Sequence, residues 1–582
     1  MKAHYSSEKN TLQLISLLKA HNIRKVVASP GNTNISFVGS IQNDPFFQVY
    51  SCVDERSAAY LACGLSEESG EPVVISCTGA TAARNYPSAL TEAYYRKLPI
   101  LAITSSQAFG RTGQLFPQFT DRNVQFNDIA TLSVQVPYPY SLEEEWSNNV
   151  KINTALLQLR RYGSGPVHIN IETIFGHDFS VTELPNERVI RRYTVMDDMP
   201  RIEGSKVCIF VGSHKKFDKG LENAIDVFCE KYNAMVLCDQ TSNYKGKYRI
   251  LGGLVAGQSE YFSSCREADL IVHLGEISGA YYSFHKCPVW RVNEDGEVRD
   301  PLKMLINIFQ MKEIQFFEYY NSLDTNSVRN TYWDEWNNEV NRISALLPEL
   351  PLSNVWMCQQ TASRLPENSV LHLGILNSLR SWNLFDVPKS VYTYSNVGGF
   401  GIDGVLSTCV GASLNDPEKT YFCVLGDLAT FYDINVLGNR HIGNNLRILV
   451  SNNGTGYEMH CSGSIGKDFG IEEADRFFAA GGHYGNKSKN LLKNFASDLG
   501  FEYLKAESKA EYLKNLEYFV SSEKLEKPIV FEVFVNVEDD DFAYDVTKKT
   551  ITSTTSAAKN IARNILGEKS YAGLKKIIRK GN

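Results

Sequence analysis

The sequence lacks the patterns that mark several common classes of protein. It has no run of about 18 apolar residues, so we expect no membrane-spanning helix. The start, MKAHYSSEKNTLQLISLL, has no uninterrupted apolar core or small-residue cleavage site, which favours a cytoplasmic protein. Neither sign of charge dominates, because 59 Lys and Arg face 66 Asp and Glu, and this balance argues against a nucleic-acid partner.

Paired cysteine motifs are also missing. The 12 cysteines include no CxxC pair, and Cys77, Cys208 and Cys423 lie in apolar runs. Such cysteines are typical of reduced, buried thiols rather than of a disulfide framework or a thiolate metal site.

Alternating apolar and helical runs predict the fold. Strand-like runs interleave with helical ones in three sets, such as KVVAS to PILAITSS, KVCIFVG to CPVWRVN, and VLHLG to PIVFEVFV. This βαβ pattern predicts an α/β chain of three doubly wound domains with mostly parallel sheets. We place the domains at residues 1–185, 186–345 and 346–545. A basic tail, 546–582, has two short amphipathic patterns; we interpret it as a docking helix pair, with a mobile lid as the alternative.

The segment VLGDLATFYDINVLGNRHIGNNLRILVSNNGTGYE contains the clearest functional signal. One strand ends at Gly426-Asp427, a helix carries Phe431, Ile434 and Leu437, and a second strand ends at Asn452-Asn453-Gly454. Because consecutive parallel strands are usually neighbours, Asp427 and the Asn pair should meet at the carboxyl edge of a sheet. Carboxylate and amide oxygens there suit Mg²⁺.

This spacing resembles the cofactor motif of the thiamine diphosphate (ThDP) enzymes. Further segments resemble the menaquinone-pathway 2-succinyl-5-enolpyruvyl-6-hydroxy-3-cyclohexene-1-carboxylate synthases: SPGNTN, VDERSAAYLACGL, CTGATAARNYPSAL, ILNSLRSW and SNVGGFGIDGVLSTCVGASL. The resemblance covers the first and third domains, and the middle one only in architecture. It implies pyrimidine-binding, central and diphosphate-binding domains, in that order.

The resemblance implies a set of cofactor ligands. Asp427, Asn452 and the Gly454 carbonyl become Mg²⁺ ligands, with Asn453 as the alternative if the register shifts by one. Ile402 matches the apolar residue that bends ThDP. The same inference places Ser378, Gly426 and Leu428 at the cofactor, with Leu428 in the GDL version of the diphosphate loop.

Two adjacent acids begin the helical run ERSAAYLACGL. By resemblance, Glu55 is the acid that hydrogen-bonds the cofactor's aminopyrimidine and activates it. Alternatively, an acid here could cap the helix or pair with Arg56, because acids are favoured in a first helical turn. We expect Asp54 to be the ordinary first-turn acid and Glu55 the catalytic one.

The substrate side departs from the family pattern. Three arginines that bind substrate carboxylates in these synthases fall on Thr33, Trp382 and Val397 here. Bidentate guanidinium groups are the usual carboxylate ligands, so their loss predicts a different acceptor, although Arg380 or Arg111 could substitute.

Other side chains are candidates for proton transfer. Glu458 has a spacing similar to a Glu of pyruvate-decarboxylase-type enzymes, and Gln118 resembles a Gln near the cofactor in several carboligases, with Gln114 as its alternative. His441, His460 and His483 are further acids or bases, each more often structural.

Together these features predict a Mg²⁺- and ThDP-dependent lyase or transferase. It would decarboxylate a 2-oxo acid and transfer the acyl-anion equivalent to an acceptor other than isochorismate. The alternatives are a simple decarboxylase that releases an aldehyde and a non-catalytic ThDP-binding homologue. We expect a homodimer or homotetramer with sites between chains.

Overall fold

The computed structural model describes residues 4–122, 124–280, 282, 284–324, 329–484 and 487–551. Two compact units divide the chain: residues 1–198 with 295–310, and residues 199–294 with 311–582. From residue 552 onward, the predicted basic tail lies outside the described residues. The boundaries of the three predicted domains stay a prediction.

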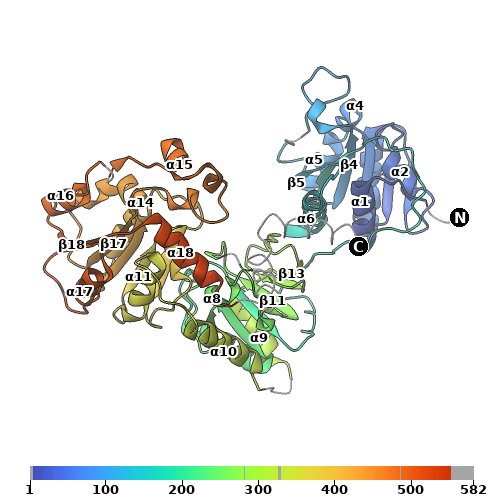
Figure 1. Ribbon diagram of the computed structural model, residues 1–582. Helices are drawn as coiled ribbons and strands as arrows, with labels where there is room; N and C mark the ends of the chain where they lie inside the picture. The colour runs from blue at the N-terminus through green and yellow to red at the C-terminus, as the bar shows by residue number, and fades with distance from the viewer. Residues whose placement is uncertain are drawn as a thin grey trace, which may run out of the picture. The chain divides into compact units, whose positions relative to one another are not determined.

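The first unit contains a parallel six-stranded sheet in the order β2-β1-β3-β4-β6-β5 (Figure 1). Strands β7 (Arg191–Tyr193) and β13 (Leu305–Phe309) form a further parallel pair. The other elements are β1 (Lys25–Ala28), β2 (Gln48–Ser51), β3 (Val73–Thr78), β4 (Ile100–Ser106), β5 (Leu132–Val136), β6 (Val167–Glu172), α1 (Lys9–Ala20), α2 (Ile35–Ile41), α3 (Glu55–Ser69), α4 (Ala80–Ala83), α5 (Pro87–Tyr95) and α6 (Leu142–Gln158).

Helices cover both faces of this sheet. Val26 joins a core with residues of α1, α2 and α6, whereas its neighbour Val27 joins one with α3 and α5. Successive strand residues point to opposite faces, so a strand buried on both sides is apolar throughout. This explains why the runs KVVAS and PVVISC show no polar alternation.

One continuous helical pattern in the sequence is divided in the structure. The run TAARNYPSALTEAYYR forms α4 and α5 rather than a single helix. Pro87 has no N–H to bond the preceding turn, and proline is tolerated only in the first turn of a helix. Pro87 therefore begins α5.

The second unit contains two parallel sheets. One has the strand order β10-β9-β8-β11-β12 and the other β15-β14-β16-β17-β19-β18. The elements of the first are β8 (Val207–Val211), β9 (Ala234–Cys238), β10 (Arg249–Leu251), β11 (Leu270–Leu274), β12 (Val289–Val292), α7 (Lys219–Lys231), α8 (Gly253–Ala256), α9 (Glu313–Ser322) and α10 (Thr331–Ala345). Those of the second are β14 (Val370–Leu373), β15 (Tyr392–Ser395), β16 (Tyr421–Gly426), β17 (Leu446–Asn452), β18 (Glu502–Ala506), β19 (Ile529–Phe534), α11 (Asn354–Thr361), α12 (Asn377–Trp382), α13 (Val405–Ser413), α14 (Asp427–Tyr432), α15 (Ile471–Phe477), α16 (Leu491–Asp498), α17 (Lys509–Phe519) and α18 (Val537–Lys548).

Buried hydrogen bonds join these two sheets within the second unit. The Gln240 backbone N–H donates to Asn383 Oδ1 at 2.8 Å, and Gln240 Nε2 donates to the Trp382 carbonyl at 3.0 Å. Helix α18 lies beside α11, and Gln258 Nε2, just after α8, donates to the Thr547 carbonyl in α18 at 2.9 Å (Figure 1). These contacts fix α12 and α18 relative to the first of the two sheets.

The predicted helix after Asp427 is also shorter than expected. Helix α14 ends at Tyr432, and Ile434–Gly438 forms a 3₁₀ turn. The Asp433 carboxylate accepts hydrogen bonds from the Ser407 N–H and Oγ, both at 2.6 Å, which holds the chain at this break. Short 3₁₀ pieces of this kind are common at helix ends.

The interior of the second unit contains a buried histidine whose protonation opposes folding. His372, in β14, is 5% exposed, and burial lowers its pKa to about 4. Below about pH 6.5 the unfolded chain takes up a proton that the folded chain does not, so stability falls with pH until about pH 4.

We therefore expect His372→Phe to be less sensitive to acid than the wild type. Phenylalanine keeps the ring near Tyr394 and cannot be protonated. In urea unfolding, the wild type should lose about 1.4 kcal/mol more than the variant for each pH unit below about 6.5. Parallel pH profiles would contradict this expectation.

The predicted fold class is confirmed: the chain is α/β, with parallel sheets and interleaved helices. Within the described ranges, no helix has both the length and the apolar character needed to cross a membrane. Both units place their polar loops at the carboxyl edges of parallel strands, which is where ligands bind in open α/β sheets.

Candidate functional site

The two halves of the GD and NN motif meet at one edge of the last sheet. Strands β16 and β17 are parallel neighbours, with Gly426 opposite Ser451. Asp427, which begins α14, and the turn after Asn452 therefore lie together, as the sequence predicted. A Cβ at Gly426 would meet no atom nearer than the Ser451 carbonyl oxygen at 4.0 Å, so this edge is open.

Asp427 is a buried carboxyl group without a cationic partner among the described residues. It is 5% exposed, and burial raises its pKa to about 7 despite backbone hydrogen bonds from Leu428 and Gly454. A buried carboxylate is costly unless it is paired or binds a metal. The surroundings of Asp427 therefore favour a bound cation that would neutralise its carboxylate.

A cavity of about 110 Å³ opens beside Asp427; we call it the Asp427 cavity. Six predicted cofactor or catalytic residues line it: Ser378, Ile402, Gly426, Asp427, Leu428 and Glu458. Its lining also includes residues that the sequence did not indicate, namely Asn354, Asn377, Thr455 and Tyr457.

The two asparagines of the motif have different surroundings. Asn452 Nδ2 donates to Glu532 Oε1 at 2.6 Å, and its Oδ1 accepts from the Gly454 N–H at 3.1 Å. Asn453 lines the Asp427 cavity, whereas neither Asn452 nor Gly454 does. Gly454 has a φ of 77°, a left-handed conformation that favours glycine in this turn.

A second buried acid lies behind the Asp427 cavity. Asp540, at the start of α18, accepts from the Asn354 N–H at 2.7 Å and from Asn377 Nδ2 at 3.4 Å, and it also bonds the side chain of Asn453. Burial raises the pKa of Asp540 to about 6. This acid orders three asparagines around the cavity, and no sequence motif had marked it.

The donors at this edge fit a hard divalent cation. Mg²⁺ prefers oxygen ligands and retains positions for phosphate oxygens. Asp427 offers a carboxylate, Asn453 an amide oxygen, and the turn through Thr455 offers carbonyl groups. The open strand end at Gly426 leaves room for a diphosphate.

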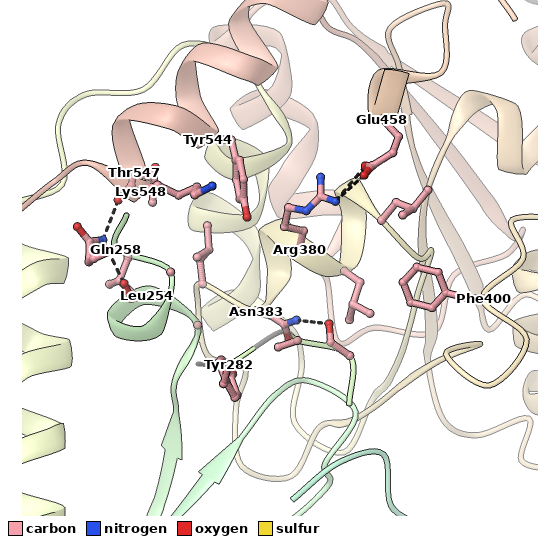
Figure 2. Close-up of a pocket in the computed structure, with 17 residues that line it drawn as sticks. Leu254, Gln258, Tyr282, Arg380, Asn383, Phe400, Glu458, Tyr544, Thr547 and Lys548 are labelled. Carbon is pink, nitrogen blue, oxygen red and sulfur yellow. Dashed lines mark hydrogen bonds and ion pairs between the residues drawn. The ribbon is translucent and has the colours of Figure 1, made fainter. Parts of the chain in front are cut away.

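A larger cavity of about 350 Å³ adjoins the first; we call it the Arg380 cavity. Figure 2 shows Arg380 and Glu458 pointing toward each other on its wall. Arg380 Nη2 donates to both carboxylate oxygens of Glu458, at 3.0 and 2.9 Å. Much of the remaining wall is apolar or aromatic, including Leu254, Tyr282, Leu379, Leu384, Phe400 and Tyr544, and Lys548 is a second cation.

The Arg380–Glu458 pair is largely shielded from water. The two side chains are 26% and 33% exposed. Burial opposes the charge on Arg380, but Glu458 and the Tyr544 ring outweigh it and raise the pKa of Arg380. Glu458 is thereby held in a fixed position.

Leu376 and Glu458 line both cavities, so they form the wall between them. Leu376, which precedes α12, has φ 63° and ψ −120°, a conformation that suits glycine rather than leucine. Phe400 in the Arg380 cavity also has a positive φ, 54°. Strained backbone of this kind tends to occur at functional sites.

The positions of the missing arginines carry no charge toward either cavity. Trp382 is 1% exposed and Val397 is 4% exposed, and both belong to the apolar core of the last sheet. Thr33, in the first unit, donates from Oγ1 to the Ser105 carbonyl at 2.8 Å. None of these three side chains offers a guanidinium group at the positions where the resemblance placed arginines.

The first unit has its own cavity at the carboxyl edge of its sheet. This Gln118 cavity, about 260 Å³, is lined by Thr33, Gly79, Gln107, Arg111, Phe116 and Gln118, among others. Gln118 has a φ of 70°. Gln114 and Gln118 are both exposed, and of the two only Gln118 lines this cavity.

The two acids at the start of α3 have separate surroundings. Asp54 caps the helix by accepting from the Ser57 N–H at 2.7 Å, as expected. Glu55 is half-buried rather than enclosed, and its carboxylate accepts from Asn85 Nδ2 at 3.4 Å. Apolar side chains nearby in sequence are exposed, including Val53 at 78% and Tyr60 at 47%. Within the described residues, Glu55 is thus not enclosed by apolar side chains.

The candidate histidines do not line the Asp427 or Arg380 cavity. His460 is buried and bonds Asp475 Oδ1 at 2.9 Å and Thr455 Oγ1 at 3.1 Å, which holds the loop after β17. His441 and His483 are exposed. His460 thus has a structural role here.

Comparison with known proteins agrees with these observations. Residues 11–126 match the family model "Thiamine pyrophosphate enzyme, N-terminal TPP binding domain". The chain is 32% identical over 556 residues to the 2-succinyl-5-enolpyruvyl-6-hydroxy-3-cyclohexene-1-carboxylate synthase of Bacteroides fragilis, covering 92% of this chain and 98% of that one. The enzyme of the same name from Bacteroides thetaiotaomicron is also 32% identical, covering 92% and 97%, and that of Christiangramia forsetii is 27% identical, covering 91% and 96%. The chain therefore belongs to the thiamine diphosphate-dependent enzymes of carbon–carbon bond chemistry, among homologues of the menaquinone-pathway synthase.

Proposed function

We propose that this enzyme, with ThDP and Mg²⁺, decarboxylates a 2-oxo acid and transfers the acyl-anion equivalent to an acceptor other than isochorismate. The observation that carries this proposal is the burial of Trp382 and Val397 in an apolar core, where the family pattern has arginines. Isochorismate and 2-oxoglutarate are rich in carboxylates, and such groups need guanidinium partners. Here Arg380 lines the Arg380 cavity beside Glu458, and we assign it to the single carboxylate of a 2-oxo acid with an uncharged side chain.

We propose that the metal is held by Asp427 and Asn453, with the carbonyl predicted at Gly454 as a further ligand. Asn453 lines the Asp427 cavity and Asn452 does not, which supports Asn453 over Asn452. When bound, ThDP supplies the nucleophilic carbon that attacks the 2-oxo acid. Ser378, Ile402 and Leu428 line the space that would orient it.

We propose that Glu55 hydrogen-bonds the aminopyrimidine and transfers a proton there. We also propose that Glu458 and Gln118 assist proton transfer on the substrate. Glu458 lies on the wall between the two cavities, so its carboxylate faces both cofactor and substrate space. The Arg380 cavity favours a 2-oxo acid with an uncharged side chain, because most of its lining is apolar.

Because Glu55 and Asp427 belong to different units and apolar residues near Glu55 are exposed, we propose a homodimer or homotetramer with sites between chains. Light scattering of active protein checks this. The three domains, 1–185, 186–345 and 346–545, remain our proposed division. The twelve cysteines all lie among the described residues and none is in a disulfide, which supports a reducing compartment such as the cytoplasm.

The test is a screen of 2-oxo acids for CO₂ release, with and without acceptor aldehydes and activated alkenes. We expect CO₂ release from pyruvate, or from another 2-oxo acid with an uncharged side chain, to be faster than from 2-oxoglutarate. An acceptor should convert the product into a ligated adduct. Efficient turnover of 2-oxoglutarate with isochorismate would overturn the proposal. Aldehyde release that no acceptor alters would instead favour the simple decarboxylase, which the presence of Glu458 supports.

Arg380→Gln should raise the KM for the 2-oxo acid about 10- to 100-fold, because a charge-assisted hydrogen bond to the substrate is lost. Glu458→Gln should lower kcat instead, since a proton donor or acceptor is removed. Arg364→Gln, which removes an exposed pair with Glu517, is the control and should change neither constant. Equal KM values for the wild type and Arg380→Gln would remove Arg380 from substrate binding.

A further inference from the structure

A cavity of about 470 Å³ lies on the first unit away from its predicted catalytic edge. Ile23 precedes β1, Pro72 precedes β3, and Arg160 lies in the connection before β6, so this cavity is at the amino edge of the sheet. The Gln118 cavity follows the carboxyl ends of β3 and β4. The two cavities therefore occupy opposite edges, and we call the first the Arg192 cavity.

Guanidinium groups dominate the charge of the Arg192 cavity. Arg160, Arg161 and Arg192 line it. Arg161 pairs with Glu297 at 2.6 Å, whereas neither Arg160 nor Arg192 forms an ion pair among the described residues. The acid in the lining, Asp197, accepts hydrogen bonds from the Thr194 N–H and Oγ1 at 2.7 and 2.8 Å. Neither Arg160 nor Arg192 is therefore neutralised by an ion pair within the described ranges. Glu297 and Asp295 nevertheless favour the charge of Arg192 from a longer distance, and Arg160 interacts with Glu71.

Arg192 is held in place by neutral acceptors. Its Nε donates to the Gly296 carbonyl at 3.0 Å and its Nη1 to the Leu157 carbonyl at 3.3 Å. Burial, and next the charge of Arg161, lower the pKa of Arg192 to about 10. A fixed, half-buried cation beside a like charge is stabilised by any anion that enters the cavity.

The uncharged residues of the cavity wall indicate a second property, besides negative charge, of a ligand that would bind there. Ile23, Pro72, Leu156 and Leu157 form an apolar wall, and Thr194 and Gln310 add uncharged hydrogen-bonding groups. Small-molecule sites typically combine an apolar lining with a few placed polar groups. The cavity suits an anion attached to an apolar body.

We propose that the Arg192 cavity is a binding site for a small organic anion, a carboxylate or phosphate monoester on an apolar body, separate from the site of reaction. Arg160 and Arg192 bind the oxyanion, since guanidinium matches carboxylate and phosphate geometry, and the apolar wall binds the body.

The test is calorimetric titration of the enzyme saturated with ThDP and Mg²⁺, so that diphosphate sites are already filled. The probes are phenyl phosphate, benzoate and inorganic phosphate. We expect saturable binding of phenyl phosphate or benzoate that is tighter than that of inorganic phosphate. Whichever of the two organic probes binds more tightly identifies the ligand as a phosphate monoester or as a carboxylate.

Arg160→Gln and Arg192→Gln should each weaken binding of the stronger probe about 10-fold. Arg160 is exposed, so its variant should fold normally even if Arg192→Gln does not. Arg96→Gln, an exposed arginine that pairs with Glu67 and Glu92, is the control and should bind like the wild type. Affinity unchanged in both cavity variants, or no saturable binding, overturns the proposal. Turnover without probe should be unaffected in Arg160→Gln, so this result is independent of the reaction assigned above.

Discussion

Replacing Glu55 by Gln should lower kcat about 10²- to 10⁴-fold, the usual cost of removing a positioned acid–base group. The amide keeps the size of the side chain and its place in the first turn of α3, but it cannot take up or release a proton. Exchange of the C2 proton of bound ThDP, followed by NMR, should slow by a similar factor. Binding of ThDP should change far less than turnover.

The adjacent acid provides a matched control. Asp54→Asn makes the same carboxylate-to-amide change one residue earlier, and Asn caps a helix about as well as Asp. Because Asp54 bonds the Ser57 N–H and has no other assigned role, this variant should retain both stability and turnover. Wild-type turnover in Glu55→Gln, or equal losses in the two variants, would remove Glu55 from the chemistry.

Asp427→Asn should weaken Mg²⁺-dependent ThDP binding by at least about 100-fold in calorimetric titration, since even indirect partners of a metal ligand cost 10- to 100-fold. The same change should raise the melting temperature of the metal-free protein. The pKa of about 7 means that the folded state holds an unpaired buried carboxylate above neutral pH, which destabilises it there. The stabilisation by Asn should therefore be larger at about pH 8 than at about pH 5.

Asp433→Asn separates loss of the ligand from loss of the fold. Asp433 is also buried, but its carboxylate accepts from both the Ser407 N–H and Oγ, and it lies outside the Asp427 cavity. This variant should melt earlier than the wild type and bind ThDP nearly as well. A stable Asp427→Asn protein with normal metal-dependent binding would exclude Asp427 as a ligand.

The fold was predictable where strands are buried on both faces. Runs such as PVVISC and LRILVSNN are mostly apolar, and they form β3 and β17. Strand β18, EYLKA, escaped prediction because it is an edge strand with partly exposed polar residues. Strand β10 was missed because it has only three residues. Short or half-exposed strands have too weak a pattern to separate from loops.

The site was predictable where a motif joins neighbouring strands. The spacing of Asp427 and the Asn pair needed only the rule that consecutive parallel strands lie together. Asp540 could not be found in this way, because it reaches Asn354 and Asn453 from a helix far away in sequence. The ion pair of Arg380 with Glu458 likewise depends on tertiary packing. Sequence named the two residues separately, for different reasons.

The backbone of Leu376 has a consequence for engineering. Its φ of 63° and ψ of −120° cost a leucine about 1–3 kcal/mol, and glycine would adopt them freely. Glycine would relieve this strain, but it would also remove a side chain that lines two cavities and raise the entropy of the unfolded chain, so we expect no net gain in stability from Leu376→Gly. The same change would remove the apolar partition between the Asp427 and Arg380 cavities. The leucine is therefore kept for the wall that it forms between the two cavities. Substitutions that raise the melting temperature of this enzyme should be sought at other positions.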